Sequence, residues 1–213
     1  MERTHSDLHD SHETGRLLEK AAAGDLTAFD ALFARNREPL RQLIELRLDR
    51  KLKRRVDPSD VIQETHVAAL RRFDDFLARR PMAFRLWLEK TARERLVKLR
   101  RRHRLAQRRS VNREARLPEH TSLALAQRLC ARPANPRDEL ARRDLLEKVR
   151  EGLARLAETD REILLMRYLE HRNNQEIAQI LDMKSDAVSR RHGRALLKLA
   201  KLLEEGGVGK SDL

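Results

Sequence analysis

The chain has 213 residues, of which 40% are hydrophobic and only 3% aromatic, so one or two domains with an aliphatic core are expected. Lysine and arginine total 47 against 34 acidic residues, and the formal net charge of +13 favours a polyanionic partner, with nucleic acid the first candidate. A single Trp and a single Tyr argue against a basic amphipathic helix on a membrane surface.

Helix breakers are few and strand-like alternation is absent. With seven glycines and six prolines, the composition favours an all-α fold. The single cysteine, Cys130, excludes an internal disulfide and a cysteine-based zinc site. The polar N-terminus does not resemble a signal peptide, and no apolar stretch approaches the roughly 20 residues of a membrane span. We expect a cytoplasmic protein with no cofactor and no membrane insertion.

The first residues are polar and rich in histidine, and residues 1 to about 14 are expected to be disordered. His5 and His9 have the i, i+4 spacing of a metal site, but a disordered tail is the simpler interpretation, so no metal site is predicted. Helical periodicity begins after this tail. Asp25 is a suitable cap for a second helix, and Pro39 is expected near the start of a further one.

The clearest helix start lies at Asp57, which is a good N-cap and is followed by Pro58 at the first helical position. Apolar residues as far as Phe76 then fall on one side, and the segment 79–81 is expected to end the helix. Three acidic or polar residues gather on the opposite side: Asp60, Gln63 and Glu64. The residues alone identify these as a solvated face that points away from the core.

A further helix is predicted to begin near Met82 and to run into a dense series of arginines that ends at Arg109. Trp87 lies upstream of this series and is expected in the core. An aromatic residue beside a basic stripe suits melted or single-stranded nucleic acid, because bases stack and phosphates pair. A basic run of this density is self-repulsive without a partner, so we predict that it binds nucleic acid.

Prolines interrupt the helical pattern between residues 110 and 137, and this stretch is predicted to be a linker with at most two helical turns. Helical periodicity returns at Asp138. Thr159 or Asp160 is a candidate cap for the next helix, and the Gly-rich tail after Leu203 is expected to be frayed.

Residues 173–199 have the pattern of a helix-turn-helix. Asn173 and Glu176 have capping-box spacing at a helix start, and Asp182 lies where the pattern breaks. Ser185 is expected to begin a second helix, whose exposed side is suited to enter a major groove. An ordinary helical hairpin is the alternative, because short patterns of this kind also arise by chance.

Two motifs in the first half complete a family resemblance. They are Asp60-x-x-Gln63-Glu64, and Phe84-Arg85-x-Trp87-Leu88 followed by an Ala92-Arg93 pair. With the helix-turn-helix in the second half, the chain resembles the small, extracytoplasmic-function type (group 4) of the bacterial sigma-70 family.

The resemblance implies two helical domains, one like sigma region 2 at 15–109 and one like region 4 at 138–203, joined by a flexible linker at 110–137. It also implies binding to core RNA polymerase, at its β′ clamp helices and β flap, and to promoter DNA. An anti-sigma factor is a further implied partner. A protein of this family is not an enzyme, because the polymerase performs the chemistry.

Site residues follow from the matched motifs. The β′ clamp helices would be contacted by Asp60, Gln63 and Glu64. The minus-ten element would be contacted by arginines of the basic helix: Arg85, Arg93, Arg100, Arg101 and Arg102. The minus-thirty-five element would be read by Lys184, Ser185, Asp186, Ser189 and Arg190 at base edges, with Arg191 and Arg194 on phosphates.

Some positions depart from the family pattern. Glu94 stands where Asn is common after the Ala-Arg pair, Lys98 where Asp is frequent, and Asp182 where the turn often has Gly. Gly193 lies inside the second helix without an evident reason. Two other classes stay open: a helix-turn-helix regulator that acts without polymerase, normally as a symmetric dimer, and a basic RNA-binding or structural protein.

Overall fold

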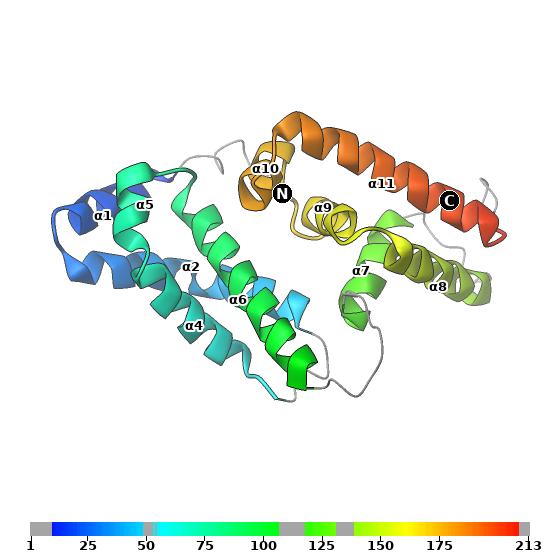
Figure 1. The fold of residues 1–213 in the computed structure, drawn as a ribbon, viewed down its shortest axis with the longest axis horizontal. Coiled ribbons are helices and arrows are strands. Elements are labelled where there is room, and N and C mark those ends of the chain that lie inside the picture. Colours follow the sequence, from blue (N-terminus) through cyan, green and yellow to red (C-terminus); the bar gives the residue numbers. More distant parts are fainter. Residues whose placement is uncertain (1–9, 49–52, 54, 107–117, 131–138, 209–213) are drawn as a thin grey trace. The chain divides into compact units, whose positions relative to one another are not determined.

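The computed structural model describes residues 10–48, 53, 55–106, 118–130 and 139–208, and within these residues it contains ten helices and no strand (Figure 1). The all-α prediction is therefore confirmed. The chain divides into two compact units, Met1–Val111 and Asn112–Leu213, each with its own hydrophobic core. The two units are described separately.

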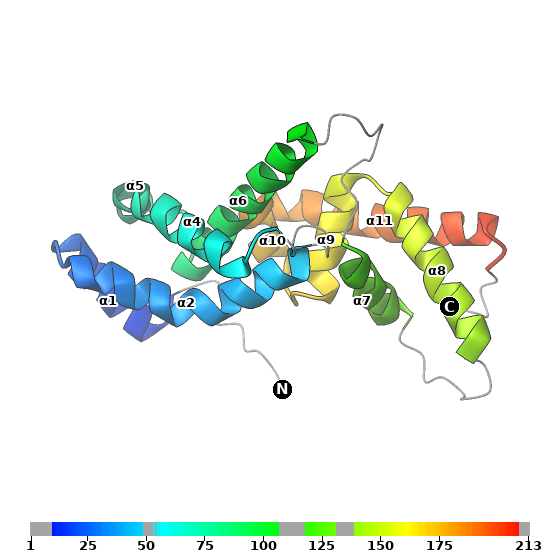
Figure 2. The same ribbon diagram turned by 90° about the horizontal axis from the view of Figure 1, so that it is seen from below.

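The described helices of the first unit are α1 (His12–Ala22), α2 (Leu26–Arg47), α4 (Pro58–Leu70), α5 (Phe73–Arg79) and α6 (Phe84–Ala106). Helices α2, α4 and α6 pack on one another, and α1 packs on α2 (Figure 1 and Figure 2). Aromatic rings lie at the centre of this core, with the Phe76 and Trp87 centroids 4.6 Å apart. Trp87 is only 5% exposed, which confirms that it belongs to the core.

The prediction that a new helix begins near Pro39 is wrong. Pro39 lies inside α2, which is one continuous helix of 22 residues. A proline in a helix interior removes a backbone hydrogen bond and costs about 3 kcal/mol. Leu40 and Ile44, both at most 1% exposed, continue the buried stripe begun by Phe29 and Leu32. Burial of these side chains offsets the cost, since each contributes roughly 1.5–3 kcal/mol.

The helix that begins at Asp57 is shorter than expected. It ends at Leu70, and Phe73 begins the separate helix α5. The break allows Phe73 and Phe76 to enter the aromatic core from a different direction. Arg80, in the left-handed conformation with φ 36°, ends α5 where a stop was expected.

The N-terminal tail is ordered earlier than expected. Ser11 caps α1, and the Asp10 carboxylate accepts a 2.8 Å hydrogen bond from the backbone N–H of Phe84 at the start of α6. The prediction that residues 1 to about 14 are disordered is therefore wrong for residues 10–14. The histidines at positions 5 and 9 lie outside the described residues.

The described helices of the second unit are α7 (Glu119–Leu129), α8 (Glu139–Arg155), α9 (Glu158–Tyr168), α10 (Asn174–Leu181) and α11 (Ser185–Glu205). Helix α7 lies inside the predicted linker, where at most two turns were expected. It has 11 residues and packs on α8 and α9, with Leu125 and Ala126 fully buried. Its contacts make it part of the second core rather than of a connecting segment.

Two ends in the second unit also differ from expectation. Helix α9 begins at Glu158 with Ala157 at the N-cap, so Thr159 and Asp160 lie in the first turn and neither is the cap. The tail after Leu203 was expected to be frayed, but it is ordered up to Val208. The Val208 backbone N–H donates to the Leu203 carbonyl, and Val208 is only 5% exposed.

Candidate functional site

The exposed side of α4 carries the predicted acidic face. The Asp57 carboxylate caps the helix by accepting a 2.8 Å hydrogen bond from the backbone N–H of Ser59. The Ser59 hydroxyl also donates to this carboxylate, and the two hydrogen bonds, that of the hydroxyl first, lower the pKa of Asp57. Asp60, Gln63 and Glu64 are all exposed, whereas Val61 and Ile62 are buried. The prediction that these three side chains point away from the core is confirmed.

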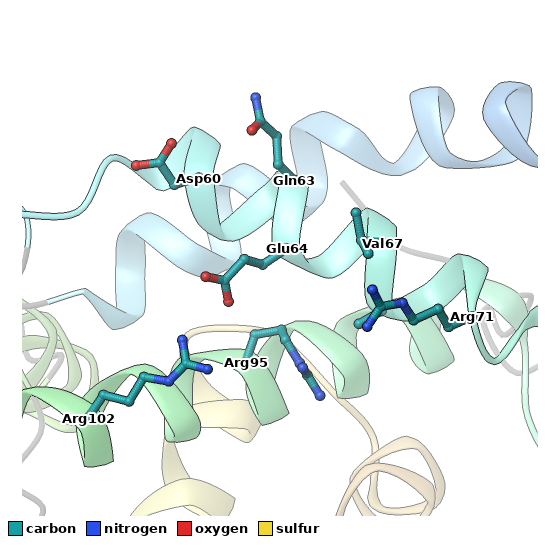
Figure 3. A pocket seen from close by; sticks show the side chains of 8 residues that line it. Asp60, Gln63, Glu64, Val67, Arg71, Arg95 and Arg102 are labelled. Atoms are coloured by element: carbon teal, nitrogen blue, oxygen red, sulfur yellow. The ribbon is translucent and has the colours of Figure 1, made fainter.

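A groove of about 450 Å³ separates this face from α6, and we call it the α4–α6 groove (Figure 3). Its lining is composed of Asp60, Gln63, Glu64, Val67, Ala68, Arg71, Arg95 and Arg102. Arg71 and Arg95 had not been singled out from the sequence. Arg71 directly follows α4, on the side that carries Glu64. Arg95 comes from the middle of α6, so only the packing of the two helices places it beside the acidic face.

The arginines predicted to contact the minus-ten element lie in different surroundings. Arg85 Nε donates to Glu89 Oε1 at 3.2 Å, and Arg93 Nη1 lies 3.6 Å from Glu89 Oε2. The Glu89 side chain is only 3% exposed, so a buried carboxylate lies between two predicted DNA-binding arginines. Sequence reasoning missed Glu89, although its i, i+4 spacing to both arginines was a usable signal.

The other three arginines lie near the end of α6. Arg100 Nη2 donates a 2.6 Å hydrogen bond to the Arg47 carbonyl at the end of α2, so its guanidinium holds two helices together. Arg101 and Arg102 are exposed. Only Arg102 of this pair lines the α4–α6 groove.

The helix-turn-helix has the local geometry that the sequence predicted. The Asn173 side chain accepts hydrogen bonds from the backbone N–H groups of Gln175 and Glu176, and the Glu176 side chain accepts one from the Asn173 N–H, which completes the capping box. Asp182 adopts the left-handed conformation, with φ 54° and ψ 48°, between the two helices. Val188 is fully buried on the inner side of α11.

An ion pair inside the helix-turn-helix was not predicted. Arg172 Nη1 donates to Glu176 Oε1 at 2.8 Å, and the two side chains are only 5% and 3% exposed. Glu176 therefore binds the helix cap and a buried guanidinium at the same time. This arrangement fixes the start of α10 and so the position of the following turn.

Helix α11 presents two sides with different roles. Lys184 at its N-cap and four residues of the helix form the exposed side: Asp186, Ser189, Arg190 and Arg194. Ser185 and Arg191 are partly buried, and Arg191 Nη1 donates to Asp160 Oδ1 on α9 at 3.0 Å. The His192 ring is stacked on Tyr168 of α9, where burial lowers the pKa of His192.

Within the described residues, no group of three His, Cys, Asp or Glu side chains is placed to hold a metal ion. None of the described helices is both long and apolar enough to cross a membrane.

These features define a helical protein with an acidic face on its first unit and a DNA-binding type of helix-turn-helix in its second. The family model for Sigma-70 region 2 matches residues 32–106, and the model for Sigma-70 region 4 matches residues 146–199. A curated relative, RNA polymerase sigma factor CnrH of Cupriavidus metallidurans, is 31% identical over 88% of this chain and 93% of its own length. The chain belongs to the sigma-70 family, as an extracytoplasmic-function sigma factor.

Two solved structures resemble most of the chain. CnrH in complex with the cytosolic domain of CnrY is 27% identical, covers 89% of this chain and 96% of its own, and has a TM-score of 0.50. RpoE in complex with the anti-sigma factor NepR, from Bartonella quintana, covers 84% of this chain and 98% of its own with a TM-score of 0.50. At 18% identity, the second likeness supports the fold alone.

Proposed function

We propose that the chain binds core RNA polymerase, directs it to promoters with a minus-ten and a minus-thirty-five element, and contributes no catalytic residue of its own. The observation that carries this proposal is the presence, in one chain, of an exposed acidic face on α4 and a helix-turn-helix with an exposed polar and basic side. A regulator that acted without polymerase would need only the second of these surfaces.

The first unit binds the β′ clamp helices through Asp60, Gln63 and Glu64. On a protein of net charge +13, an exposed acidic face is suited to a basic partner surface rather than to DNA. The minus-ten element is held by arginines of α6. Arg101 and Arg102 are exposed, so these two are the best placed for direct contact. Arg85 and Arg93 lie against Glu89, and Arg100 donates to the Arg47 carbonyl.

The second unit reads the minus-thirty-five element through the exposed side of α11. Lys184, Ser185, Asp186, Ser189 and Arg190 are the candidates for base edges, and Arg194 is the candidate for a phosphate. Arg191 combines a phosphate contact with its ion pair to Asp160. The second unit also contacts the β flap. An anti-sigma factor is proposed as a regulator, because the similar structure of CnrH contains the cytosolic domain of CnrY as a bound partner.

Mapped transcription starts test this function. Purified core polymerase is mixed with genomic DNA fragments, with and without the chain, and the 5′ ends of the transcripts are sequenced. We expect new starts that share two upstream sequence elements, and Arg190→Ala should reduce use of the upstream element while leaving general DNA affinity nearly unchanged. If Arg190→Ala weakens binding to all sequences equally, α11 does not read bases.

A further inference from the structure

The start of α6 is capped by a residue that is distant in sequence. Ala83 directly precedes this helix, and its carbonyl accepts a 3.1 Å hydrogen bond from the Trp87 N–H, which places Ala83 at the N-cap position. Alanine has no side-chain acceptor and is a poor N-cap. The Asp10 carboxylate supplies the missing acceptor, since it accepts a 2.8 Å hydrogen bond from the backbone N–H of Phe84, the first residue of α6.

The hydrogen bond between Asp10 and Phe84 lies at the edge of the aromatic core. Asp10 is partly buried, and Phe84 is fully buried, with its ring centroid 5.6 Å from that of Phe76. A carboxylate that accepts a backbone N–H at a helix N-terminus forms a charge-assisted hydrogen bond and interacts favourably with the positive end of the helix dipole. Asp10 therefore fixes the first turn of α6 from outside the helix.

Arg85 follows Phe84 in this first turn. Its Nε donates to Glu89 Oε1 at 3.2 Å, and the Glu89 side chain is only 3% exposed, so a buried group holds one edge of the guanidinium. The Nη1 and Nη2 atoms of Arg85 form no hydrogen bond with the described residues, and the side chain is 35% exposed. These two nitrogens are available for a phosphate or a base edge, in a geometry set by the first turn and by Glu89.

We propose that Asp10 is a positioning residue for Arg85 in binding of the minus-ten element. This proposal rests on the proposed function and goes beyond it, because Asp10 precedes α1 and lies outside the residues 32–106 that match Sigma-70 region 2. Asp10 acts without touching DNA. It fixes the backbone from which the Arg85 side chain extends, so that less conformational freedom is lost when Arg85 binds. Without Asp10, the first turn frays and this advantage is lost.

The test uses holoenzyme reconstituted from core polymerase and the full chain. The probe is a fluorescent single-stranded oligonucleotide that carries the minus-ten element shared by the mapped transcription starts. Asp10→Ala removes the acceptor, whereas Asp10→Asn keeps a side-chain oxygen that caps a helix equally well. Glu19→Ala is the matched control, because Glu19 is an exposed acidic residue of α1 whose side chain makes no ion pair or hydrogen bond with the described residues.

The affinity for the oligonucleotide should depend on the acceptor at position 10. Asp10→Ala should raise the Kd of the holoenzyme for the oligonucleotide about fivefold, while Asp10→Asn and Glu19→Ala should each change it less than about twofold. The Kd of the chain for core polymerase should change less than about twofold in all three variants, because the acidic face lies on α4. Circular dichroism checks that each variant is folded.

A double-mutant cycle with Arg85→Ala separates positioning from a general structural effect. If Asp10 acts through Arg85, Asp10→Ala should raise the Kd for the oligonucleotide by less than about a further twofold once Arg85 is already alanine. A loss of structure in the first unit would instead weaken binding to a similar extent in both backgrounds.

Three results would overturn the proposal. One is that Asp10→Ala binds the oligonucleotide as well as Glu19→Ala does. Another is that Asp10→Ala costs as much affinity with Arg85→Ala as without it. The third is that Asp10→Asn loses as much as Asp10→Ala, which would make the negative charge rather than the hydrogen-bond acceptor responsible. Failure of the proposed function is a separate outcome, in which the wild-type holoenzyme itself does not bind the oligonucleotide and both proposals fall together.

Discussion

Arg191 on α11 and Asp160 on α9 form an ion pair of 3.0 Å that joins the predicted recognition helix to the helix before the helix-turn-helix. The Asp160 side chain is 18% exposed and the Arg191 side chain 37%, so the pair is partly protected from water. Its position suggests that orientation of α11 depends on contacts outside the helix-turn-helix.

A double-mutant cycle measures the strength of this ion pair. Asp160→Asn, Arg191→Gln and the double variant should give a coupling energy of about 0.5–1 kcal/mol in chemical unfolding, in the upper part of the range for surface pairs because of the partial burial. Additive effects of the two substitutions would show that the pair does not stabilise the unit.

Glu89 should matter more to the first unit than an exposed glutamate on the same helix. Glu89→Ala leaves Arg93, only 9% exposed, without its carboxylate, and should lower the free energy of unfolding by about 1–3 kcal/mol. Glu94→Ala removes the more exposed pair with Arg72 and should cost less than about 1 kcal/mol. Urea unfolding of both variants makes the comparison, and equal losses would contradict the assigned role of Glu89.

Two glycines in helices should respond in opposite ways to alanine. A Cβ at Gly193 would have nothing within 4 Å, so Gly193→Ala should raise the free energy of unfolding by about 0.5–1 kcal/mol. A Cβ at Gly152 would lie 2.8 Å from Leu199 Cδ1, and Gly152→Ala should stabilise less than Gly193→Ala or should destabilise. Thermal unfolding of the two variants decides this, and a greater gain at Gly152 would refute the packing argument.

Stability should depend on pH through His192. Burial, with a smaller contribution from Arg167, lowers the pKa of His192 in the folded chain below its ordinary 6.5. The unfolded chain then binds the proton more readily, so stability is greatest above the unfolded-state pKa and falls as the pH drops through it. Wild type should lose more free energy of unfolding than His192→Gln between about pH 7.5 and 5.5. Parallel pH profiles would show that His192 does not contribute.

Local signals explain which parts of the fold were predictable. The capping box at Asn173 and Glu176, the Asp57-Pro58 start and the left-handed Asp182 each depend on residues close in sequence. Pro39 inside α2 and the buried helix α7 were not predictable in the same way. They are stabilised by packing against other helices, and periodicity in a short window does not contain that information.

In the candidate sites too, features set by residues close in sequence were predictable, and features set by helix packing were not. Helical periodicity was sufficient to place Asp60, Gln63 and Glu64 on an exposed face of α4. It could not place Arg95 or Arg102 opposite them, because this depends on how α4 and α6 cross. The contact between Arg100 and the Arg47 carbonyl likewise joins residues far apart in sequence.

The most direct test of the central claim is the affinity of the chain for purified core RNA polymerase, measured for wild type, for Asp60→Ala/Glu64→Ala and for Asp74→Ala/Asp75→Ala. The control pair is also acidic and exposed, but it lies on α5 outside the groove. We predict saturable binding by wild type and by the control, with a loss of at least about tenfold for Asp60→Ala/Glu64→Ala. Absence of binding by wild type, or an equal loss in both variants, would contradict the account.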